Sequence, residues 1–376
     1  MHYLAITTPT LQRSLTVLAG ICLTILLIQL ADRIQPRSYT FRWQNISSRF
    51  QLRVIWMSLG AIIVITILAG VGLIVGDYPI PALKAIATAL WDRNGEYDFI
   101  VNSLRFPRII VAILAGMCFA SSGLIFQSLI NNPLVSPDII GINSGAAVLA
   151  VAILAAGGNI AYLPYAAFLG ALLTAALIYL LSWKRGISAT RLVLVGIGIN
   201  AVLGAIITYI TIKYPIERVI AAARWQAGTL FGATWDDART LSIGLFFLLP
   251  PAFFLTTRLR ILQLGDETAI TIGSKIERDR LALLAVASLL AALAVSVVGP
   301  LGFVALIVPQ AARLLLGYIT GGVLIFTALL GGFFLLGADL IAQRLFAPVM
   351  LPAGVITATF GGPYFLYLLA RYNRAN

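Results

Sequence analysis

The chain has 376 residues, of which 60% are hydrophobic and only 11% are charged. A soluble globular protein carries far more charge on its surface, so this composition excludes one and indicates a protein embedded in a membrane. The net charge of +12 is spread over many short connectors and is not gathered in one patch, which argues against nucleic acid as a partner.

The first predicted element is the apolar run at residues 15–31. Its length of about 17 residues is marginal for crossing a hydrocarbon core of roughly 30 Å. Three interpretations stay open: an extra span with the N-terminus outside, a helix on the membrane surface, or an uncleaved leader-like segment. We take residues 1–51 as an N-terminal extension that consists of this run and a basic connector.

Ten longer apolar runs follow, and no long polar segment separates them. We therefore predict an all-α polytopic membrane protein with about ten transmembrane helices plus the extra N-terminal apolar segment. The predicted spans are 52–76, 107–129, 139–157, 162–183, 191–213, 240–257, 281–298, 302–317, 323–343 and 352–370. Glycine is frequent within these spans, as expected where helices pack closely on one another.

The distribution of lysine and arginine predicts the orientation of these spans. Basic residues accumulate in alternate connectors: residues 32–53, 184–191, 258–280 and the C-terminal tail after 370. Connectors of this kind face the cytoplasm by the positive-inside rule. We therefore expect a multi-pass protein of the cytoplasmic membrane, with its C-terminus inside and residues 77–106 outside.

Ionisable residues are nearly absent from the predicted spans, apart from Arg108 and Asp339 close to their outer ends. A secondary transporter usually has buried carboxylates or broken helices that line an ion site, so their near absence argues against that class. The two cysteines, Cys22 and Cys118, and the single His2 form neither a disulfide framework nor a zinc site. We expect no catalytic residues and no metal site in this chain.

The connector at 258–280 is long, amphipathic and mixed in charge. Gly265 and Gly273 bracket a short predicted helix, and Asp266 and Glu267 would stabilise the positive end of its dipole. The pattern alone fits two interpretations: a surface helix at the membrane interface, or a docking helix for a cytoplasmic partner.

A resemblance to a known family favours the docking helix. The stretches LRFPRIIVAILAG (104–116), NPLVSPDIIGINSGAA (132–147), LGDETAITIG (264–273), VGPLGFVALIVPQAARLLLG (298–317) and LPAGVITATFGGPYFLYLL (351–369) resemble the FecCD-type permeases of ABC importers for ferric siderophores, haem and cobalamin. The resemblance extends over residues 52–374, in order and with similar spacing. It implies the type II importer permease fold for that region.

The resemblance also implies a role for the connector. Glu267, Ala269 and Gly273 match the E-x-A-x-x-x-G pattern of the coupling loop that binds the ATP-binding cassette subunit, with Gly265 and Asp266 just before it. We expect Ala269 to face the groove of that subunit. The chain has no G-x-x-x-x-G-K-[ST] loop, so ATP and Mg²⁺ are expected on the separate subunit and no cofactor on this chain.

Further positions match the family in the same way. Arg105, Arg108 and Arg344 match outward arginines that pair with acids of a periplasmic or lipid-anchored substrate-binding protein. Membrane-interface snorkelling is the alternative interpretation of these arginines. Two copies of the chain, or this chain and a sister permease, would enclose a central path.

Two inner gates are implied. Asn132 and Leu134 match one gate position, inside a Pro- and Gly-rich stretch (132–145) that would otherwise be a plain helical turn. Ala189 and Thr190 match the other, where the family often has two hydroxyl residues. The chain also departs from the family at Gln310, where histidine is common, and at the uncharged segment 318–322.

The substrate implied is a large iron chelate, because the spans lack the carboxylates and imidazoles that a bare cation requires. A ferric siderophore is the first choice, and haem or cobalamin is the alternative within the same family. A secondary transporter of small hydrophobic solutes is the alternative from another class.

Overall fold

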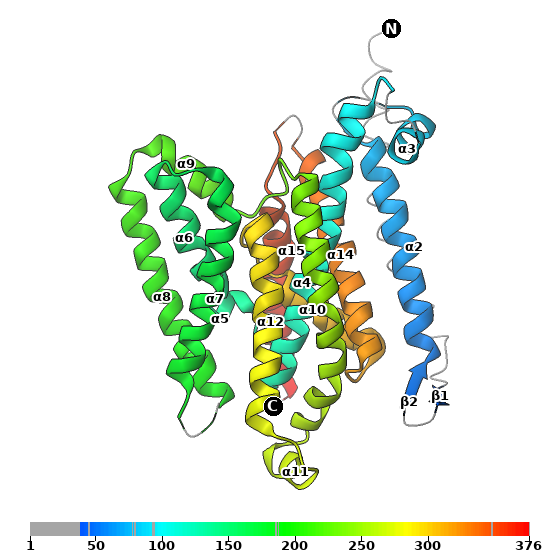
Figure 1. Cartoon of the computed structure of the whole chain (residues 1–376), viewed down its shortest axis with the longest axis vertical. Coiled ribbons are helices and arrows are strands. Elements are labelled where there is room, and N and C mark those ends of the chain that lie inside the picture. Colours follow the sequence, from blue (N-terminus) through cyan, green and yellow to red (C-terminus); the bar gives the residue numbers. More distant parts are fainter. Residues whose placement is uncertain are drawn as a thin grey trace.

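The computed structural model describes residues 38–43, 46–76, 78, 80–91, 95–184, 186, 188–346 and 349–375. The apolar run at 15–31 lies outside the described residues, so its three interpretations stay open. The described chain starts with a two-stranded antiparallel hairpin and is helical from Leu52 onward (Figure 1).

The elements follow one another in this order: β1 (Ser38–Trp43), β2 (Ile46–Gln51), α2 (Leu52–Ile74), α3 (Ala82–Leu90), the π-helical segment η1 (Phe99–Arg105), α4 (Phe106–Ile130), α5 (Pro137–Ile140), α6 (Ile142–Ala156), the 3₁₀ turn η2 (Ile160–Tyr162), α7 (Leu163–Ser182), α8 (Ala189–Lys213), α9 (Ile216–Gln226), α10 (Trp235–Leu262), α11 (Asp266–Thr271), α12 (Ile276–Val298), α13 (Val304–Leu316), α14 (Gly321–Arg344) and α15 (Ala353–Ala375).

Each of the ten predicted ranges overlaps a helix of the structure. Among the described residues, seven helical segments are long and apolar enough to cross a membrane: α2, η1 with α4, η2 with α7, α8, α10, α12 and α14. α6 and α13 are apolar but shorter, with 15 and 13 residues. The membrane-spanning helical fold is therefore confirmed, and the count of ten spans stays a prediction. The sequence interpretation missed the hairpin, which occupies the end of the expected basic connector.

α4 is the central helix of the bundle. It packs against α14, α12, α10 and α13, and 78% of its apolar segment is buried inside the chain. The close packing depends on glycine: a Cβ atom at Gly116 would overlap the carbonyl oxygen of Gly331, and one at Gly123 would overlap that of Ala305. Backbones that meet at this distance leave no room for side chains, so α4, α13 and α14 form a tightly packed core.

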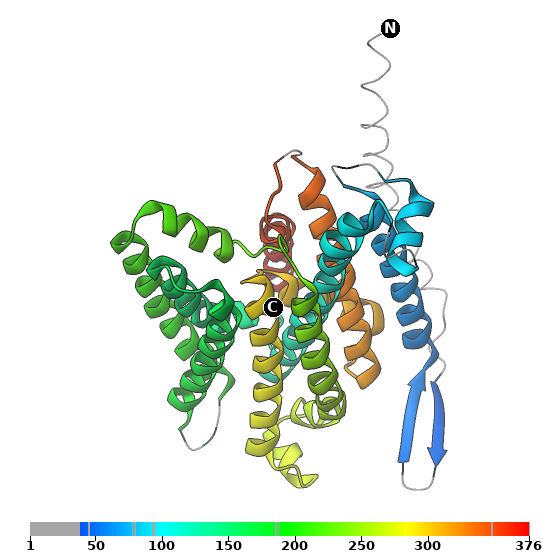
Figure 2. The same ribbon diagram turned by 45° about the horizontal axis from the view of Figure 1, so that its top comes forward.

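A second group of helices, α6 to α9, lies beside this core (green in Figures 1 and 2). α6 and α7 meet through Gly145 and Gly170, whose backbones also approach too closely for a side chain. α8 lies on the outside of this group, and only 6% of its apolar segment is buried in the chain. An apolar helix with so little internal packing must face lipid or another protein subunit.

Candidate functional site

The short helix α11 lies between α10 and α12 at one extreme end of the molecule (Figure 1). Gly265 and Gly273 flank it at backbone φ angles of +95° and +87°, which glycine adopts without the strain that other residues incur. Asp266 and Glu267 occupy its first turn, and Asp266 forms an ion pair of 2.7 Å with Arg280 of α12. The predicted helix and its two bracketing glycines are confirmed, and the helix is tied to the membrane-spanning body.

The expected orientation of Ala269 is wrong. Its side chain is fully buried inside the chain, where α11 contacts α10 and α12. The reason is that α11 must pack one face against the ends of its two neighbours, and a small side chain on that face lets the helix lie close to them. The exposed apolar side chains are instead Ile270 and Ile272, at 64% and 57% exposure.

A surface pocket of about 540 Å³ opens beside α11. It is lined by Asp266, Ile270, Ser274, Lys275, Ile276, Glu277 and Arg278. Ile270 and Ile276 contribute apolar surface, and the other five residues are charged or polar. This mixture suits the insertion of a side chain from another protein better than burial inside this chain.

The Pro- and Gly-rich stretch begins where α4 ends. Asn131 ends α4 in the left-handed conformation (φ +52°), and the side chain of Asn132 accepts a 2.9 Å hydrogen bond from the backbone of Leu134. Gln310 of α13 donates to the carbonyl oxygen of Pro133 at 3.2 Å and to the Gln127 side chain at 2.7 Å. The turn is therefore fixed by side chains. One of them is Gln310, which stands where histidine is common in the family.

The two predicted gate positions lie in different elements, since Asn132 and Leu134 follow α4 and Ala189 and Thr190 begin α8. The 132–145 stretch meets α8 at Gly196, where an added Cβ would lie 2.6 Å from the carbonyl oxygen of Ile140, and at Asn200, whose side-chain oxygen accepts a hydrogen bond from the Ser144 hydroxyl. Ala189 and Thr190 lie in the first turn of α8, on the N-terminal side of Gly196, and Thr190 is exposed. Asn132 and Leu134 are partly buried. Their roles as gates stay a prediction.

The predicted docking arginines, Arg105, Arg108 and Arg344, lie at the end of the molecule opposite α11. At that end α2 and α14 finish and α4 begins (Figure 1). The Arg105 guanidinium donates to the carbonyl oxygens of Leu73 and Ile74, at 2.7 and 3.1 Å, and to that of Tyr78 at 2.6 Å. A cation at the negative end of a helix dipole stabilises that helix, so Arg105 has a structural role at the end of α2. Arg344 is partly buried as the last residue of α14.

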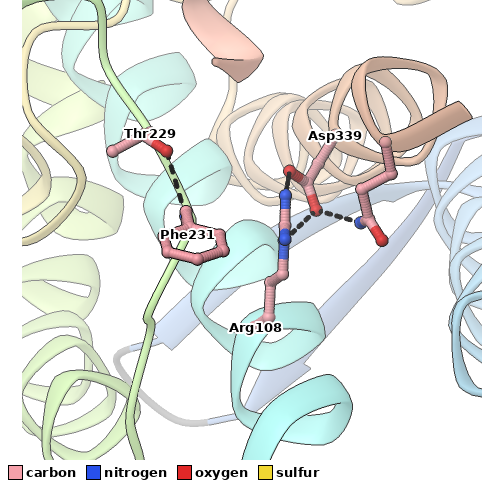
Figure 3. Close-up of polar contacts among 5 residues, drawn as sticks. Arg108, Thr229, Phe231 and Asp339 are labelled. Atoms are coloured by element: carbon pink, nitrogen blue, oxygen red, sulfur yellow. Dashed lines mark hydrogen bonds and ion pairs between the residues drawn. The ribbon is translucent and has the colours of Figure 1, made fainter. Parts of the chain in front are cut away.

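Arg108 and Asp339 face one another across α4 and α14 (Figure 3). The pair is bidentate, with Nε–Oδ2 and Nη2–Oδ1 distances of 2.8 and 2.7 Å, and Gln343 donates to Asp339 at 2.8 Å. The side chain of Asp339 is 2% exposed and that of Arg108 is 12% exposed. The sequence showed both residues as isolated exceptions in apolar spans, and no local signal indicated that they are partners.

No group of three or more His, Cys, Asp or Glu residues that could hold a metal occurs in the described part of the chain.

Residues 59–371 match the FecCD transport family. The chain belongs to this family. It is 38% identical over 310 residues to the ferric enterobactin transport system permease protein FepG of Escherichia coli (strain K12), covering 82% of this chain and 94% of that protein. It is also 36% identical over 359 residues to the cobalamin import system permease protein BtuC of Halobacterium salinarum, covering 93% of this chain and 94% of that protein.

Among solved structures, the chain resembles one described as an inward-facing conformation of a metal-chelate type ABC transporter. The TM-score is 0.74 and the identity 25%, with 84% of this chain and 99% of that chain covered. The FecCD-type resemblance inferred from the sequence motifs is thereby confirmed. The chain is a multi-pass inner-membrane permease of the ABC importer class and is not an enzyme by itself.

Proposed function

We propose that this permease carries a ferric siderophore across the inner membrane, driven by ATP that a separate subunit binds with Mg²⁺ and hydrolyses. The observation that supports the proposal best is α11 with its adjacent pocket. The six-residue helix exposes Ile270, and the residue that follows its last one, Ile272, is exposed too; an ion pair to α12 connects the helix to a spanning helix. Movement of a subunit bound there would be transmitted directly to α12.

The second copy, or a sister permease, is proposed to pack beside α8. This helix exposes large apolar side chains along its length, among them Leu194, Val202 and Ile212, and also Gly198 and Gly204, next to which there is open space. Exposed glycines in a spanning helix are typical of close helix–helix contact rather than of a lipid-facing surface. The path for substrate would then run between the two copies, bounded by α8 and the 132–145 stretch.

At the other end of the molecule we propose docking of a periplasmic or lipid-anchored substrate-binding protein. Arg105 is held by backbone carbonyl oxygens and keeps its charge, so it would present a fixed positive charge to that partner, whereas the charge of Arg108 is balanced by Asp339. We propose that the C-terminus and α11 then face the cytoplasm. Impermeant thiol labelling in intact cells tests it: a cysteine at Lys84 should react, one at Lys275 should not, and the reverse pattern would contradict the orientation.

The Ile270→Asp substitution tests the docking role of α11. Ile270 is 64% exposed, so the change should cost the isolated permease less than about 0.5 kcal/mol. A buried apolar anchor of an interface contributes about 2 kcal/mol or more, which corresponds to a roughly thirty-fold loss of affinity for the ATPase subunit. Copurification of that subunit and siderophore uptake should both decrease.

The matched control is Leu83→Asp on α3, at the opposite end, where the side chain is 84% exposed. This variant should retain the ATPase subunit. Full copurification and uptake with Ile270→Asp would instead support a plain surface helix. If no ATPase subunit copurifies even with the unchanged chain, a secondary transporter of small hydrophobic solutes becomes the better interpretation.

The choice of substrate within the family needs its own experiment, because the relatives above include both a ferric enterobactin and a cobalamin permease. Deletion of this subunit should abolish growth on a ferric siderophore as sole iron source. Retained growth on every ferric siderophore offered, together with lost uptake of haem or cobalamin, would assign the chain to one of those substrates.

A further inference from the structure

Arg280, in the second turn of α12, holds two carboxylates at the end of the molecule where α11 lies. Its Nη2 atom donates to the Oδ1 atom of Asp266 at 2.7 Å, and its Nη1 atom lies 3.9 Å from the Oε1 atom of Glu277. The side chain of Arg280 is 18% exposed, whereas those of Asp266 and Glu277 are 53% and 42% exposed. The cation is thus largely covered, and both of its carboxylate partners reach the surface.

The two carboxylates line the pocket beside α11, and Arg280 is not among the residues that line it. A partner that binds in this pocket would therefore contact Asp266 and Glu277, with Arg280 behind them. Ion pairs as exposed as these contribute little to folding stability, because water screens the charges and the long side chains lose conformational freedom. The arrangement is better explained by the position that it gives to the two carboxylates.

Glu277 also touches the connector between α7 and α8. A Cβ atom added at Gly186 would lie 2.7 Å from the Oε1 atom of Glu277, so the carboxylate lies directly against the backbone of this connector. The connector is in turn attached to α8, because Arg191 donates to the carbonyl oxygens of Lys184 and Gly186, at 3.0 and 2.6 Å. The ends of α7 and α8 that it joins lie at the same end of the molecule as α11 (Figure 1).

The first turn of α8 continues this series of contacts toward the predicted gate. Leu192, next to Arg191, is 3% exposed and lines a small internal cavity of about 20 Å³ together with Ile140 of α5 and Leu284 of α12. Ala189 and Thr190 lie in the same turn of α8. The contacts therefore lead from the pocket beside α11, through Arg280, Glu277 and the connector, to the predicted gate positions.

The segments that these contacts join have little internal packing. The first buried residue of α12 is Leu283, so residues 276–282 lie outside the core. Only 6% of the apolar segment of α8 is buried, compared with 78% of the segment that contains α4. A segment with few buried contacts can shift at a lower cost in free energy than a closely packed one.

We propose that Arg280 and Glu277 are positioning residues that link α11 to the first turn of α8, so that a displacement of α11 by the ATPase subunit moves the predicted gate residues. The inference rests on the proposed function, because it requires α11 to be the docking site. Two sites influence each other only through an element whose position both of them change. Here that element is the start of α12 together with the connector. Loss of the Arg280 charge would break the link and leave the exposed Ile270 available for docking.

Hydrogen exchange of the permease, with its ATPase subunit, in nanodiscs tests this link and docking separately. Protection of residues 264–274 when the subunit binds reports docking at α11. A change in the exchange of residues 184–196 on binding of the subunit and ATP reports the link. The variants are Arg280→Gln and Asp266→Asn, which remove the same ion pair from its two sides. Arg258→Gln is the matched control, because it removes an exposed cation from α10 at the same end of the molecule.

The unchanged chain and the control should show both effects. Arg280→Gln should keep the protection at α11 and reduce the response of residues 184–196 about fivefold or more, and Asp266→Asn should reduce it in the same direction. A full response in both variants, with α11 still protected, would overturn the inference and leave docking at α11 intact. An equal reduction in the Arg258→Gln control would also overturn it. Absence of protection at α11 in the unchanged chain would overturn the docking role and this inference with it.

Discussion

The Asp339→Asn substitution removes the charge opposite Arg108 while nearly preserving the volume of the side chain. In the structure this carboxylate accepts two hydrogen bonds from Arg108 and one from Gln343, and its side chain is 2% exposed. Water cannot replace the lost charge at such a site, so Arg108 would remain a buried cation without its counter-ion.

The expected cost follows from this burial. Breaking a buried ion pair by removing one partner destabilises a protein by about 3–5 kcal/mol, whereas an exposed pair contributes only about 0–1 kcal/mol. A loss of this size corresponds to a decrease in the unfolding midpoint on the order of 10 °C. The double replacement Arg108→Met with Asp339→Leu should cost much less, because it leaves no buried charge without a partner.

Thermal unfolding of the purified permease in detergent, followed by size-exclusion chromatography, measures these shifts. Glu217→Gln, at an exposed position in the first turn of α9, is the control and should change the midpoint by about 1 °C or less. An Asp339→Asn midpoint that shifts no more than that of the control would contradict the expected cost of the unpaired Arg108. A double variant less stable than both single variants would contradict it too, because the pair itself would then be strongly stabilising.

Two further predictions concern the packing of α4 and the turn that follows it. Gly123→Ala should decrease the yield of folded protein, because the added methyl group overlaps the backbone oxygen of Ala305 and forces α4 and α13 apart, at a cost of about 1–3 kcal/mol or more. The control is Gly70→Ala, whose methyl group meets open space and should leave the yield unchanged. Equal yields of the two variants would contradict the close packing of α4 and α13. Gln310→Ala should accelerate amide hydrogen exchange in residues 131–136, since the Pro133 carbonyl oxygen loses its donor, and unchanged exchange would show that the turn is held by other contacts.

The positions of the helices were largely predictable because hydrophobicity over 18 or more residues is a local property of the sequence. Helix ends were less predictable. α10 was expected at 240–257 but extends over Trp235–Leu262, because its first turn is polar and is stabilised by a capping box between Thr234 and Asp237. A hydropathy window does not detect such a turn, although the T-x-x-D pattern was present to be read.

The hairpin was missed for a similar reason. Alternation of aromatic and polar residues from Tyr39 to Trp43 is a strand signal. The arginines of the same stretch were used only to predict which side of the membrane the connector faces. Long-range partners were beyond the sequence altogether. Arg108 and Asp339 are separated by 231 residues, and nothing in either local sequence identifies the other.

The orientation of Ala269 shows a different limit. Its position in the coupling pattern was recognised, but which face of a six-residue helix is buried depends on where the ends of α10 and α12 lie. A family motif assigns a residue to a function without stating how it acts. In this structure the buried alanine allows α11 to lie close to its neighbours, and the neighbouring Ile270 is available to a partner.

The uneven burial of the helices suggests which parts move during transport. α4 is buried along most of its length and contacts α13 and α14 backbone to backbone, so a change in its position would disrupt the whole core. α8 has little internal packing; α5 touches it at Gly196, and Ser144 of α6 donates a hydrogen bond to Asn200. We therefore expect nucleotide-driven changes to occur in residues 131–141 and the first turns of α8, while α4 keeps its place. Hydrogen exchange of the complex with and without ATP measures this, and comparable changes in α4 would show that the core itself rearranges.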